Sequence, residues 1–208
     1  MSLLERLRPA VVDRLGKGWE ERHGQEFRGD LLAAAGGRVL EVGAGTGHNG
    51  AYYPDAVEEL VLSEPSAPSL DRARRRLSEA GREATFVVAP AERLPFDDGS
   101  FDTVVSTAVL CSVFDPDASL REIGRVLRPG GQLLFSEHVR AADPDLAKWQ
   151  DRLEGIWRMV TGGCHPNRDT LAALEASGLE IVELERGELP QSPSLVRPLI
   201  TGRAVSPS

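Results

Sequence analysis

Several features are scarce in this chain of 208 residues, and each scarcity argues against a class of protein. Two cysteines, Cys111 and Cys164, are too few for a disulfide scaffold and fit a reducing cytoplasm. No CxxC motif or His/Cys cluster has the spacing of a zinc site, so we expect no metal. No run approaches the roughly 20 apolar residues that span a bilayer, and the N-terminus has no apolar signal segment, so we expect no membrane span.

Positive charge is also limited. The formal net charge is −8 and there is no basic tract, which argues against a nucleic-acid backbone as the main partner. The hydrophobic share of 41% and the charged share of 27% are ordinary for a globular protein. We therefore expect one domain over residues 1–208, located in the cytoplasm as a monomer or homodimer.

A glycine-rich stretch follows the first apolar run of the chain. Residues 39–42 predict a short buried strand, and Gly43, Gly45 and Gly47 follow at a spacing of two. Gly43 can take the positive φ that ends a strand, and Gly45 leaves room for a ligand against bare backbone. Residues 48–53 can start a helix whose free N–H groups point into the turn. This pattern predicts a nucleotide-type site at the carboxyl end of a first strand.

The spacing of the glycines separates two cofactors. A dinucleotide fingerprint reads G-x-G-x-x-G, whereas this chain reads G-x-G-x-G, which favours S-adenosylmethionine (SAM) over NAD. Glu64 lies 21 residues after Gly43, at the end of another apolar run. A carboxylate there can accept hydrogen bonds from both ribose hydroxyls of an adenosyl cofactor. Glu64 therefore supports the site without choosing between the two ligands.

Apolar periodicity along the rest of the chain alternates between strand and helix patterns. It predicts strands over residues 59–63, 84–89, 101–106, 132–139, 179–185 and 195–205. It predicts helices over residues 70–80, 117–127, 148–160 and 170–176, and a helical leader over residues 1–35. Such alternation predicts a parallel sheet with right-handed crossovers.

Local signals predict where these elements begin and end. We expect Pro65 and Pro68 to bracket a turn, and the sequence Arg-Pro-Gly-Gly at 128–131 to stop a helix. Asn167 or Asp169 is expected to cap the helix over 170–176.

Five motifs together resemble the class I SAM-dependent methyltransferases along nearly the whole chain. They are the loop Glu-Val-Gly-Ala-Gly-Thr-Gly at 41–47, the acidic Glu64, and the segments 91–96, 101–106 and 125–131. The resemblance implies an α/β, Rossmann-like fold with helices on both faces of a seven-stranded, mostly parallel sheet. The implied strand order is 3-2-1-4-5-7-6, with strand 7 antiparallel.

The resemblance also implies roles for single residues, with SAM as the cofactor. Glu41 would lie near the methionine ammonium, and Gly43 and Gly45 would cradle the methionyl and ribose parts. Glu64 would hold the ribose. Many relatives have an Asp before the next motif, where this chain has Pro90. The remaining implied cofactor residues are Ala44, Gly47, Asn49, Pro65, Ala91, Glu92 and Thr107.

A narrower resemblance points to the methyltransferase-like group that contains alkyl thiol S-methyltransferases. It rests on the segments 52–54, 109–113, 137–139, 163–164 and 195–198. Eukaryotic members of that group carry an N-terminal membrane anchor, and no such segment is present in this sequence. The match leaves the methyl acceptor open, because acceptor choice depends on the side chains that line one pocket.

The chemistry of the acceptor decides which side chains are needed. A thiol, with a pKa of about 8.5, is partly ionised near neutrality and needs little help. A hydroxyl or amine acceptor would need a general base, for which His138 and His165 are the candidates. Residues 140–178 are expected to form a helical segment beside the acceptor pocket. Cys111, Cys164 and the apolar residues Trp149, Trp157 and Met159 are further candidates for its lining, or for core packing.

We therefore expect a SAM-dependent methyltransferase of a small molecule, with a thiol as the leading acceptor. An O- or N-methyltransferase of a metabolite is the alternative within the class. An NAD-binding oxidoreductase and a catalytically silent SAM-binding protein are the alternatives outside it.

Overall fold

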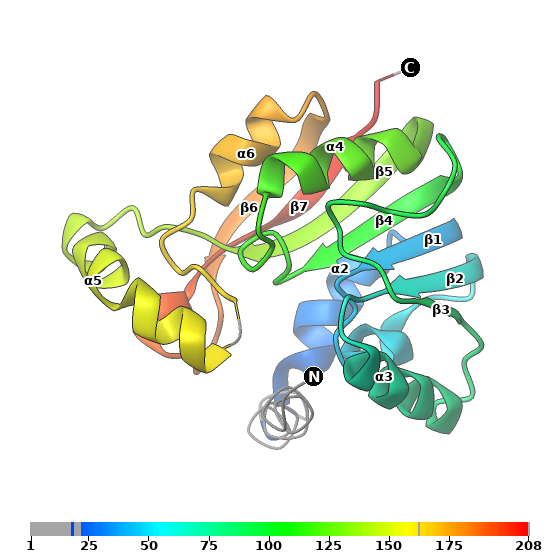
Figure 1. The fold of residues 1–208 in the computed structure, drawn as a ribbon, viewed down its shortest axis with the longest axis horizontal. Coiled ribbons are helices and arrows are strands. Elements are labelled where there is room, and N and C mark those ends of the chain that lie inside the picture. The colour runs from blue at the N-terminus through cyan, green and yellow to red at the C-terminus, as the bar shows by residue number, and fades with distance from the viewer. Residues whose placement is uncertain (1–17, 19–21, 162, 208) are drawn as a thin grey trace.

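The computed structural model describes residue 18 and residues 22–161 and 163–207, which build a seven-stranded sheet (Figure 1). The strand order is β3-β2-β1-β4-β5-β7-β6, as the family resemblance implies. The strands are β1 (Gly37–Val42), β2 (Val57–Ser63), β3 (Thr85–Val87), β4 (Phe101–Thr107), β5 (Leu127–His138), β6 (Glu180–Glu188) and β7 (Pro198–Val205). Strands β1 to β5 pair in parallel, and β7 pairs antiparallel with both β5 and β6. The predicted topology, with strand 7 antiparallel, is confirmed.

Helices connect these strands. The longer ones are α3 (Ala67–Glu79), α4 (Pro116–Val126), α5 (Pro144–Thr161) and α6 (Thr170–Ala176). Short turns are the π-helical η1 (Gln25–Gly29), α2 (Asp30–Leu32) and the 3-10 turns η2 (His48–Tyr52) and η3 (Ser194–Val196). None of the helices in the described part of the chain combines the length and apolar character needed to cross a membrane.

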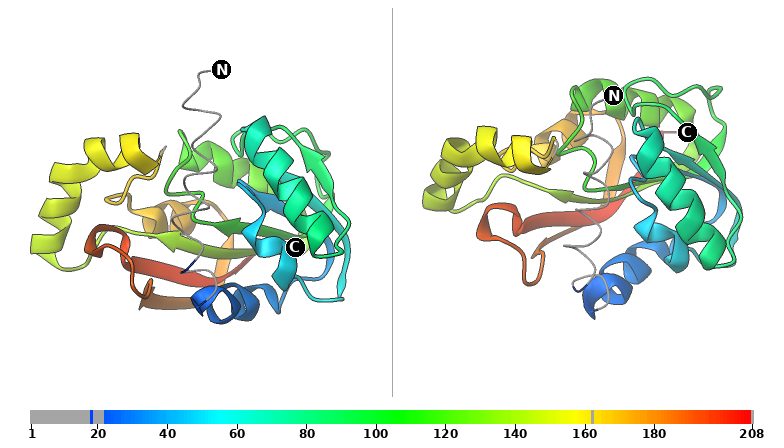
Figure 2. Two further views of the ribbon diagram at one scale, coloured as in Figure 1. Left: turned by 90° about the horizontal axis from the view of Figure 1, so that it is seen from below. Right: turned by 60° about the horizontal axis from the view of Figure 1, so that its bottom comes forward.

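Side chains alternate between the two faces of the sheet, so each central strand contributes to two cores. Leu40 and Val104 lie in one core, which α4 and α6 cover. Val39 and Val105, their neighbours in sequence, lie in the other core with α2 and α3. Helix α5 instead extends away from the sheet in the three views (Figures 1 and 2). The strands are therefore covered on both faces, and their carboxyl ends are left for the site.

The ends of several elements differ from the sequence prediction. Helix α3 begins at Ala67, so Pro68 lies in its first turn, where a missing N–H costs nothing because that group has no partner in the helix. Helix α4 ends at Val126, directly before residues 128–131 as predicted, and those residues also form the first part of β5. The cap of α6 is Asp169, whose Oδ1 accepts from Ala172 N at 3.1 Å.

The predicted helical leader over residues 1–35 lies largely outside the described residues. The described part is helical from Arg22 through η1 and α2. Leu31 and Leu32 are buried against the sheet. This short segment therefore anchors the start of the described chain to the α2 and α3 face.

Candidate functional site

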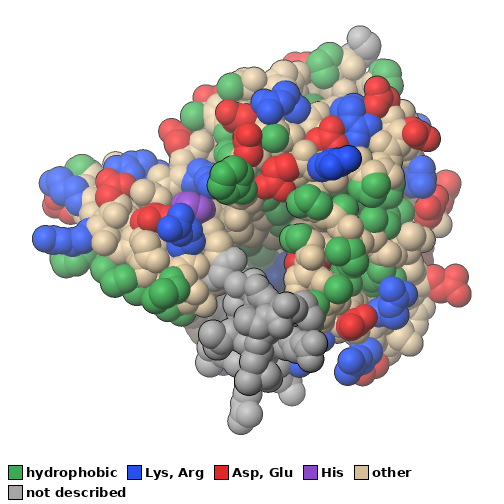
Figure 3. Space-filling model, viewed as in Figure 1, with side chains coloured by type: hydrophobic (Ala, Val, Ile, Leu, Met, Phe, Trp, Pro, Cys, Tyr) green, Lys and Arg blue, Asp and Glu red, His purple; other side chains and the backbone are tan. Residues whose placement is uncertain are grey.

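Two adjoining cavities lie at the carboxyl ends of β1 and β4. The larger, of about 700 Å³, and the smaller, of about 300 Å³, share Gly43 and Ala108 in their walls. Here the strand order reverses, since β2 and β4 lie on opposite sides of β1. Ligands of open α/β sheets bind at such a switch point. Figure 3 shows that this face of the molecule is hollowed near its centre. We call the two cavities together the crevice.

The three glycines of the loop after β1 have three different tasks. Gly43 has φ +59°, and a Cβ placed on it would lie 2.6 Å from Val109 Cγ1, so only glycine fits this turn. Gly45 has φ +54°, and apart from its chain neighbours no atom of the described residues lies nearer than 4.0 Å to an added Cβ. Gly47 packs against α3, because its Cβ would lie 2.9 Å from Ala73 Cα. Of the three, Gly45 is therefore the one that offers bare backbone to a ligand.

Glu64 joins the glycine loop to the loop after β2. Its Oε2 accepts from Gly45 N at 3.1 Å, and its Oε1 accepts from Ser66 N at 3.0 Å. Glu64 lines the larger cavity together with Pro65. The carboxylate predicted to hold a ribose is thus pre-positioned by two backbone amides at the mouth of the crevice.

Glu41 is the most deeply buried acidic group of the smaller cavity, with 2% of its surface exposed. Its Oε2 accepts from the Tyr53 hydroxyl at 2.8 Å, and its Oε1 accepts from Asn49 Nδ2 at 3.0 Å. Asn49 Nδ2 also donates to Thr107 Oγ1, and its Oδ1 accepts from Arg28 Nη1 at 2.6 Å. Burial raises the pKa of Glu41 to about 7, against the opposing hydrogen bond from Tyr53. A cation bound beside Glu41 would restore its charge.

The predicted adenine motif lines the other end of the larger cavity. Pro90, Ala91 and Glu92 all border it. The Glu92 carboxylate is already engaged, because its Oε1 accepts from Phe114 N at 2.8 Å and from Asp115 N at 3.3 Å. Glu92 therefore holds the segment after β4, and the main chain of this motif remains for a ligand.

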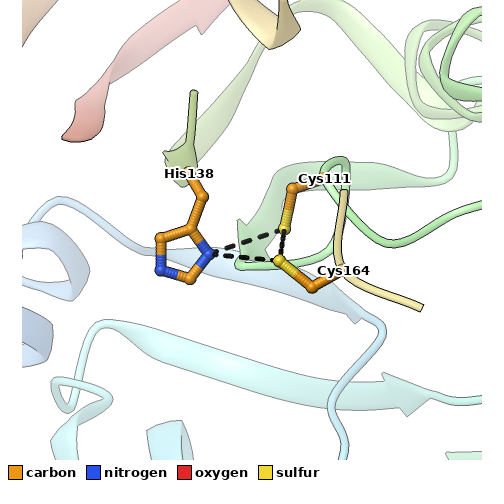
Figure 4. A group of neighbouring side chains, drawn as sticks. All are labelled: Cys111, His138 and Cys164. Carbon is orange, nitrogen blue, oxygen red and sulfur yellow. Dashed lines mark hydrogen bonds between the residues drawn. The ribbon is translucent and has the colours of Figure 1, made fainter. Parts of the chain in front are cut away.

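His138, Cys111 and Cys164 form a tight cluster, which we call the Cys/His cluster (Figure 4). His138 Nδ1 lies 3.7 Å from Cys111 Sγ and 3.9 Å from Cys164 Sγ, and the two sulfur atoms are 3.8 Å apart. The interaction with Cys164, reinforced by burial, raises the pKa of Cys111, whereas the interaction with Cys111 lowers the pKa of Cys164. Burial opposes protonation of His138, but its contact with Cys111 raises its pKa overall. None of the three lines either cavity of the crevice.

The other histidine candidate faces a different group. His165 Nδ1 lies 2.9 Å from Glu154 Oε1 on α5, and the backbone N of His165 donates to Cys111 O at 2.8 Å. Burial lowers the pKa of the His165 imidazole. His165 does not line the crevice, so its visible task is to connect α5 with the loop that carries Cys111.

Glu137 is a buried residue of the site that the sequence reasoning missed as a working group. Its Oε1 accepts from Ser106 Oγ at 2.7 Å and from Val109 N at 3.0 Å, and its Oε2 accepts from Cys111 N at 3.2 Å. Burial raises the pKa of Glu137. A carboxylate at the end of an apolar strand was the available signal. The two carboxylate oxygens of Glu137 therefore hold the turn between β4 and Cys111 in place.

Helix α5 does not supply the apolar wall or core considered from the sequence. Trp149 is 53% exposed and Met159 is 76% exposed. Trp157 is the exception, since it packs against Cys111, Cys164 and Val196. Its buried Nε1 has no hydrogen-bond partner within the described residues.

Comparisons with known proteins identify the family and agree with the fold. Residues 40–135 match a family model described as a methyltransferase domain. Thiol S-methyltransferase TMT1A of Homo sapiens is 38% identical over 87% of this chain and 74% of its own length. The fold is similar to a putative methyltransferase from Bacillus halodurans, with a TM-score of 0.73, 20% identity and coverage of 88% of this chain and 98% of that one.

A further solved structure is the N-methyltransferase NodS from Bradyrhizobium japonicum in complex with S-adenosylhomocysteine. It has a TM-score of 0.65 and 20% identity, and covers 90% of this chain and 87% of its own. The cofactor of the protein described here is SAM. The chain belongs to the class I SAM-dependent methyltransferases, in the methyltransferase-like group that includes the thiol S-methyltransferases.

Proposed function

We propose that this methyltransferase transfers the methyl group of SAM to the sulfur of a small-molecule thiol. The observation that carries the acceptor class is the 38% identity to thiol S-methyltransferase TMT1A over 87% of the chain. That similarity reaches well beyond the methyltransferase model over residues 40–135. It therefore includes segments that are candidates for the acceptor side.

We place the adenosine part of SAM in the larger cavity. Glu64 would accept from the ribose hydroxyls, and the main chain around Ala91 would contact the adenine, flanked by Pro65. Pro90 offers no N–H, and Glu92 already accepts from Phe114 and Asp115. This assignment is supported by the volume of about 700 Å³, which suits a group of that size.

The methionine part is assigned to the smaller cavity. Glu41 would face the ammonium there, and the open side of Gly45 would face the ligand backbone, with Ala44 and Thr107 in the wall. A buried carboxylate with a pKa of about 7 gains from a neighbouring cation, which supports this orientation. The sulfonium would then lie near Gly43 and Ala108, where the cavities join.

When bound, SAM supplies a methyl group that is already activated for in-line displacement. The protein's contribution is to align the acceptor and to exclude water, and alignment can be worth about 7–11 kcal/mol. The carboxylates of the crevice, Glu41, Glu64 and Glu92, all accept hydrogen bonds from the protein. An acceptor that ionises near neutrality, such as a thiol, therefore suits this site better than one that needs a strong base.

A competition assay tests the proposal. The purified protein and SAM are mixed with a panel of alkyl thiols, phenols, amines and carboxylates, and products are identified by mass. We expect thioethers and S-adenosylhomocysteine to form in equal amounts. Preferred methylation of a phenol or amine would overturn the thiol assignment. Binding of SAM without any product across the panel would indicate a silent SAM-binding protein.

A further inference from the structure

The Cys/His cluster has the dimensions of a metal site. A tetrahedral zinc ion has Zn–S bonds of about 2.3 Å and Zn–N bonds of about 2.0–2.1 Å, so its ligand atoms lie about 3.8 Å (S to S) and about 3.6 Å (S to N) apart. The observed separations are 3.8 Å between the sulfur atoms and 3.7 and 3.9 Å from sulfur to His138 Nδ1. Three corners of such a tetrahedron are therefore in place within a few tenths of an ångström.

Hydrogen bonding alone explains this convergence poorly. Nδ1 of a neutral imidazole has one lone pair, yet two sulfur atoms lie at nearly equal distances from it. Thiol S–H groups are weak donors, so they gain little by burying three polar atoms in contact. Two thiolates and one imidazole around a common centre are, by contrast, a ligand set that zinc prefers.

Further hydrogen bonds hold the backbone around the proposed ligands, as is usual for metal ligands. Glu137 Oε2 accepts from Cys111 N, and Arg168 Nη1 donates to the carbonyls of Leu110 and Val113 at 2.7 and 2.8 Å, which fixes the Cys111 loop. Thr170 Oγ1 donates to His138 O at 3.1 Å. The buried Nε1 of Trp157 has no hydrogen-bond partner within the described residues, and the Trp157 side chain packs against Cys111, Cys164 and Val196. A metal-bound sulfur would give this N–H a hydrogen-bond acceptor.

The cluster lies beside the crevice. Cys111 follows β4 and His138 ends β5, at the same edge of the sheet as the cofactor cavities. Val109 and Ser112, which flank the Cys111 segment, line the larger cavity. Cys111 Sγ lies 3.4 Å from Ser112 Oγ, so a ligand on that side of the cluster would lie next to the larger cavity.

We propose that Cys111, His138 and Cys164 bind a zinc ion whose fourth position takes the sulfur of the acceptor thiol, an assignment that rests on the proposed function. The thiol loses its proton to solvent on binding the metal, because a coordinating thiol is deprotonated outright. Its sulfur lone pair forms the new S–CH₃ bond while the bond between the methyl and the sulfonium breaks. The products are a neutral thioether and S-adenosylhomocysteine, with one proton released. The thioether is the weaker ligand and leaves the metal.

Metal binding is tested first, without any acceptor. The full chain is purified under reductant, its zinc content is measured by mass spectrometry, and the metal-free protein is titrated with Co²⁺. Because the sequence contains two cysteines only, sulfur-to-cobalt charge-transfer absorption reports on Cys111 and Cys164 alone. We expect one metal ion per chain. Absence of the band and of bound zinc would overturn the proposal.

Variants assign the ligands. Cys164→Ser and His138→Asn should each lower zinc affinity by roughly a hundredfold, since even second contacts of metal ligands are worth about 10–100-fold. His165→Asn is the matched control, because His165 faces Glu154, and it should retain the metal. Circular dichroism identifies any variant that fails to fold, and the unsubstituted chain then still decides the result through its cobalt spectrum. Unchanged zinc affinity in both ligand variants would overturn the assignment.

The catalytic part is tested separately. Removal of zinc by a chelator should lower the rate of thiol methylation at pH 7 at least tenfold without changing SAM affinity, and added Zn²⁺ should restore it. Full thiol methylation by the metal-free protein would overturn the role of the ion while the proposed function stands. Bound zinc without methylation of any thiol would overturn the proposed function instead, and the role of the ion with it.

Discussion

The crevice and the Cys/His cluster beside it are built from different atoms. The proposed cofactor end, in the crevice, uses oxygen and backbone N–H groups: Glu41 lies near the end of β1, and Gly45 and Glu64 lie on the loops after β1 and β2. The proposed acceptor end, the Cys/His cluster beyond β4 and β5, uses sulfur and imidazole from Cys111, His138 and Cys164. Hard oxygen acceptors suit an ammonium and hydroxyl groups, whereas soft thiolate sulfur suits a metal ion such as zinc. The chemistry of each end thus fits the ligand that we propose for it.

The two ends also differ in how their groups are held. The carboxylates of the cofactor end are fixed by direct hydrogen bonds from neighbours in the same or the next loop. The acceptor end is fixed by long connections, since Glu137, His165 and Arg168 tie three distant segments together. Substitutions at the cofactor end should therefore change SAM affinity without releasing distant segments of the chain, which the following predictions use.

The largest effect is expected at Glu41. Glu41→Gln removes the buried negative charge opposite the proposed ammonium, and loss of one partner of a buried charge pair costs about 2–5 kcal/mol. We expect SAM affinity to fall by that amount in calorimetry, whereas 5′-methylthioadenosine, which lacks the amino acid, should bind unchanged. Glu59→Gln is the control, because Glu59 is half-exposed and pairs with Arg38. Equal affinity of Glu41→Gln and the unsubstituted protein for SAM would contradict the assignment.

The next effect is expected at Glu64. Glu64→Ala should weaken binding by about 1.5–3 kcal/mol, the range for hydrogen bonds to a charged group. Since Glu64 is assigned to the ribose, SAM and 5′-methylthioadenosine should lose similar affinity, in contrast to Glu41→Gln. A loss confined to SAM would move Glu64 to the methionine part of the ligand.

A smaller effect concerns pH. Burial raises the pKa of Glu41 to about 7, so Glu41 is protonated below pH 7 in the ligand-free protein. A bound cation favours the ionised form, and SAM affinity should therefore rise about tenfold, or about 1.4 kcal/mol, from pH 6 to pH 8. It should level off above pH 8. Glu41→Gln should have a flat profile over this range, and an unchanged slope in that variant would exclude Glu41 as the titrating group.

The raised pKa of Glu41 has the opposite consequence for the stability of the fold. The folded-state pKa of Glu41 lies above its ordinary value of 4.5, so the native state binds more protons than the unfolded state between pH 4.5 and 7. The contribution of Glu41 to the free energy of unfolding is therefore largest below pH 4.5 and is lost as pH rises towards 7. Denaturant unfolding of the protein and of Glu41→Gln at pH 5 and 7.5 measures this difference. SAM binding and folding thus favour different forms of one carboxyl group.

The sequence predicted the glycine turn at the end of β1 because the residues that form it are local. Gly43, Gly45 and Glu64 follow strand patterns directly, and the positive φ values of the glycines agree with the expected turn. The order of all seven strands was implied by the resemblance to the methyltransferase family, and the structure confirms it. The sequence could not show that some predicted cofactor residues have a structural role instead or as well. Gly47 packs on α3, and Glu92 accepts a hydrogen bond from Phe114 N.

Cys111, His138 and Cys164 were each candidates from the sequence, but their clustering was not predicted because they lie far apart along the chain. His138 lies 27 residues from Cys111 and 26 from Cys164, so no local spacing connects them. Only the parallel pairing of β4 with β5 and the return of the chain after α5 bring them together. The expectation of no metal came from spacing along the chain, and spacing says nothing about such a cluster. The exposure of Trp149 and Met159 could not be predicted either, because buried helices show the same helical periodicity of apolar residues.

The smallest effect is expected at Ala108, where the two cavities of the crevice meet. Ala108 has φ +56°, a left-handed conformation that costs a residue with a Cβ about 1–2 kcal/mol. Ala108→Gly removes this strain but adds backbone entropy to the unfolded chain, worth about 0.5–1 kcal/mol. We therefore expect a net gain of up to about 1 kcal/mol in the free energy of unfolding by denaturant. The matched control is Ala80→Gly at φ −82°, which has no such strain to relieve and should lower stability by about 0.5–1 kcal/mol. Equal losses in both variants would show that the turn at Ala108 is unstrained, and that the junction of the crevice can move at little cost.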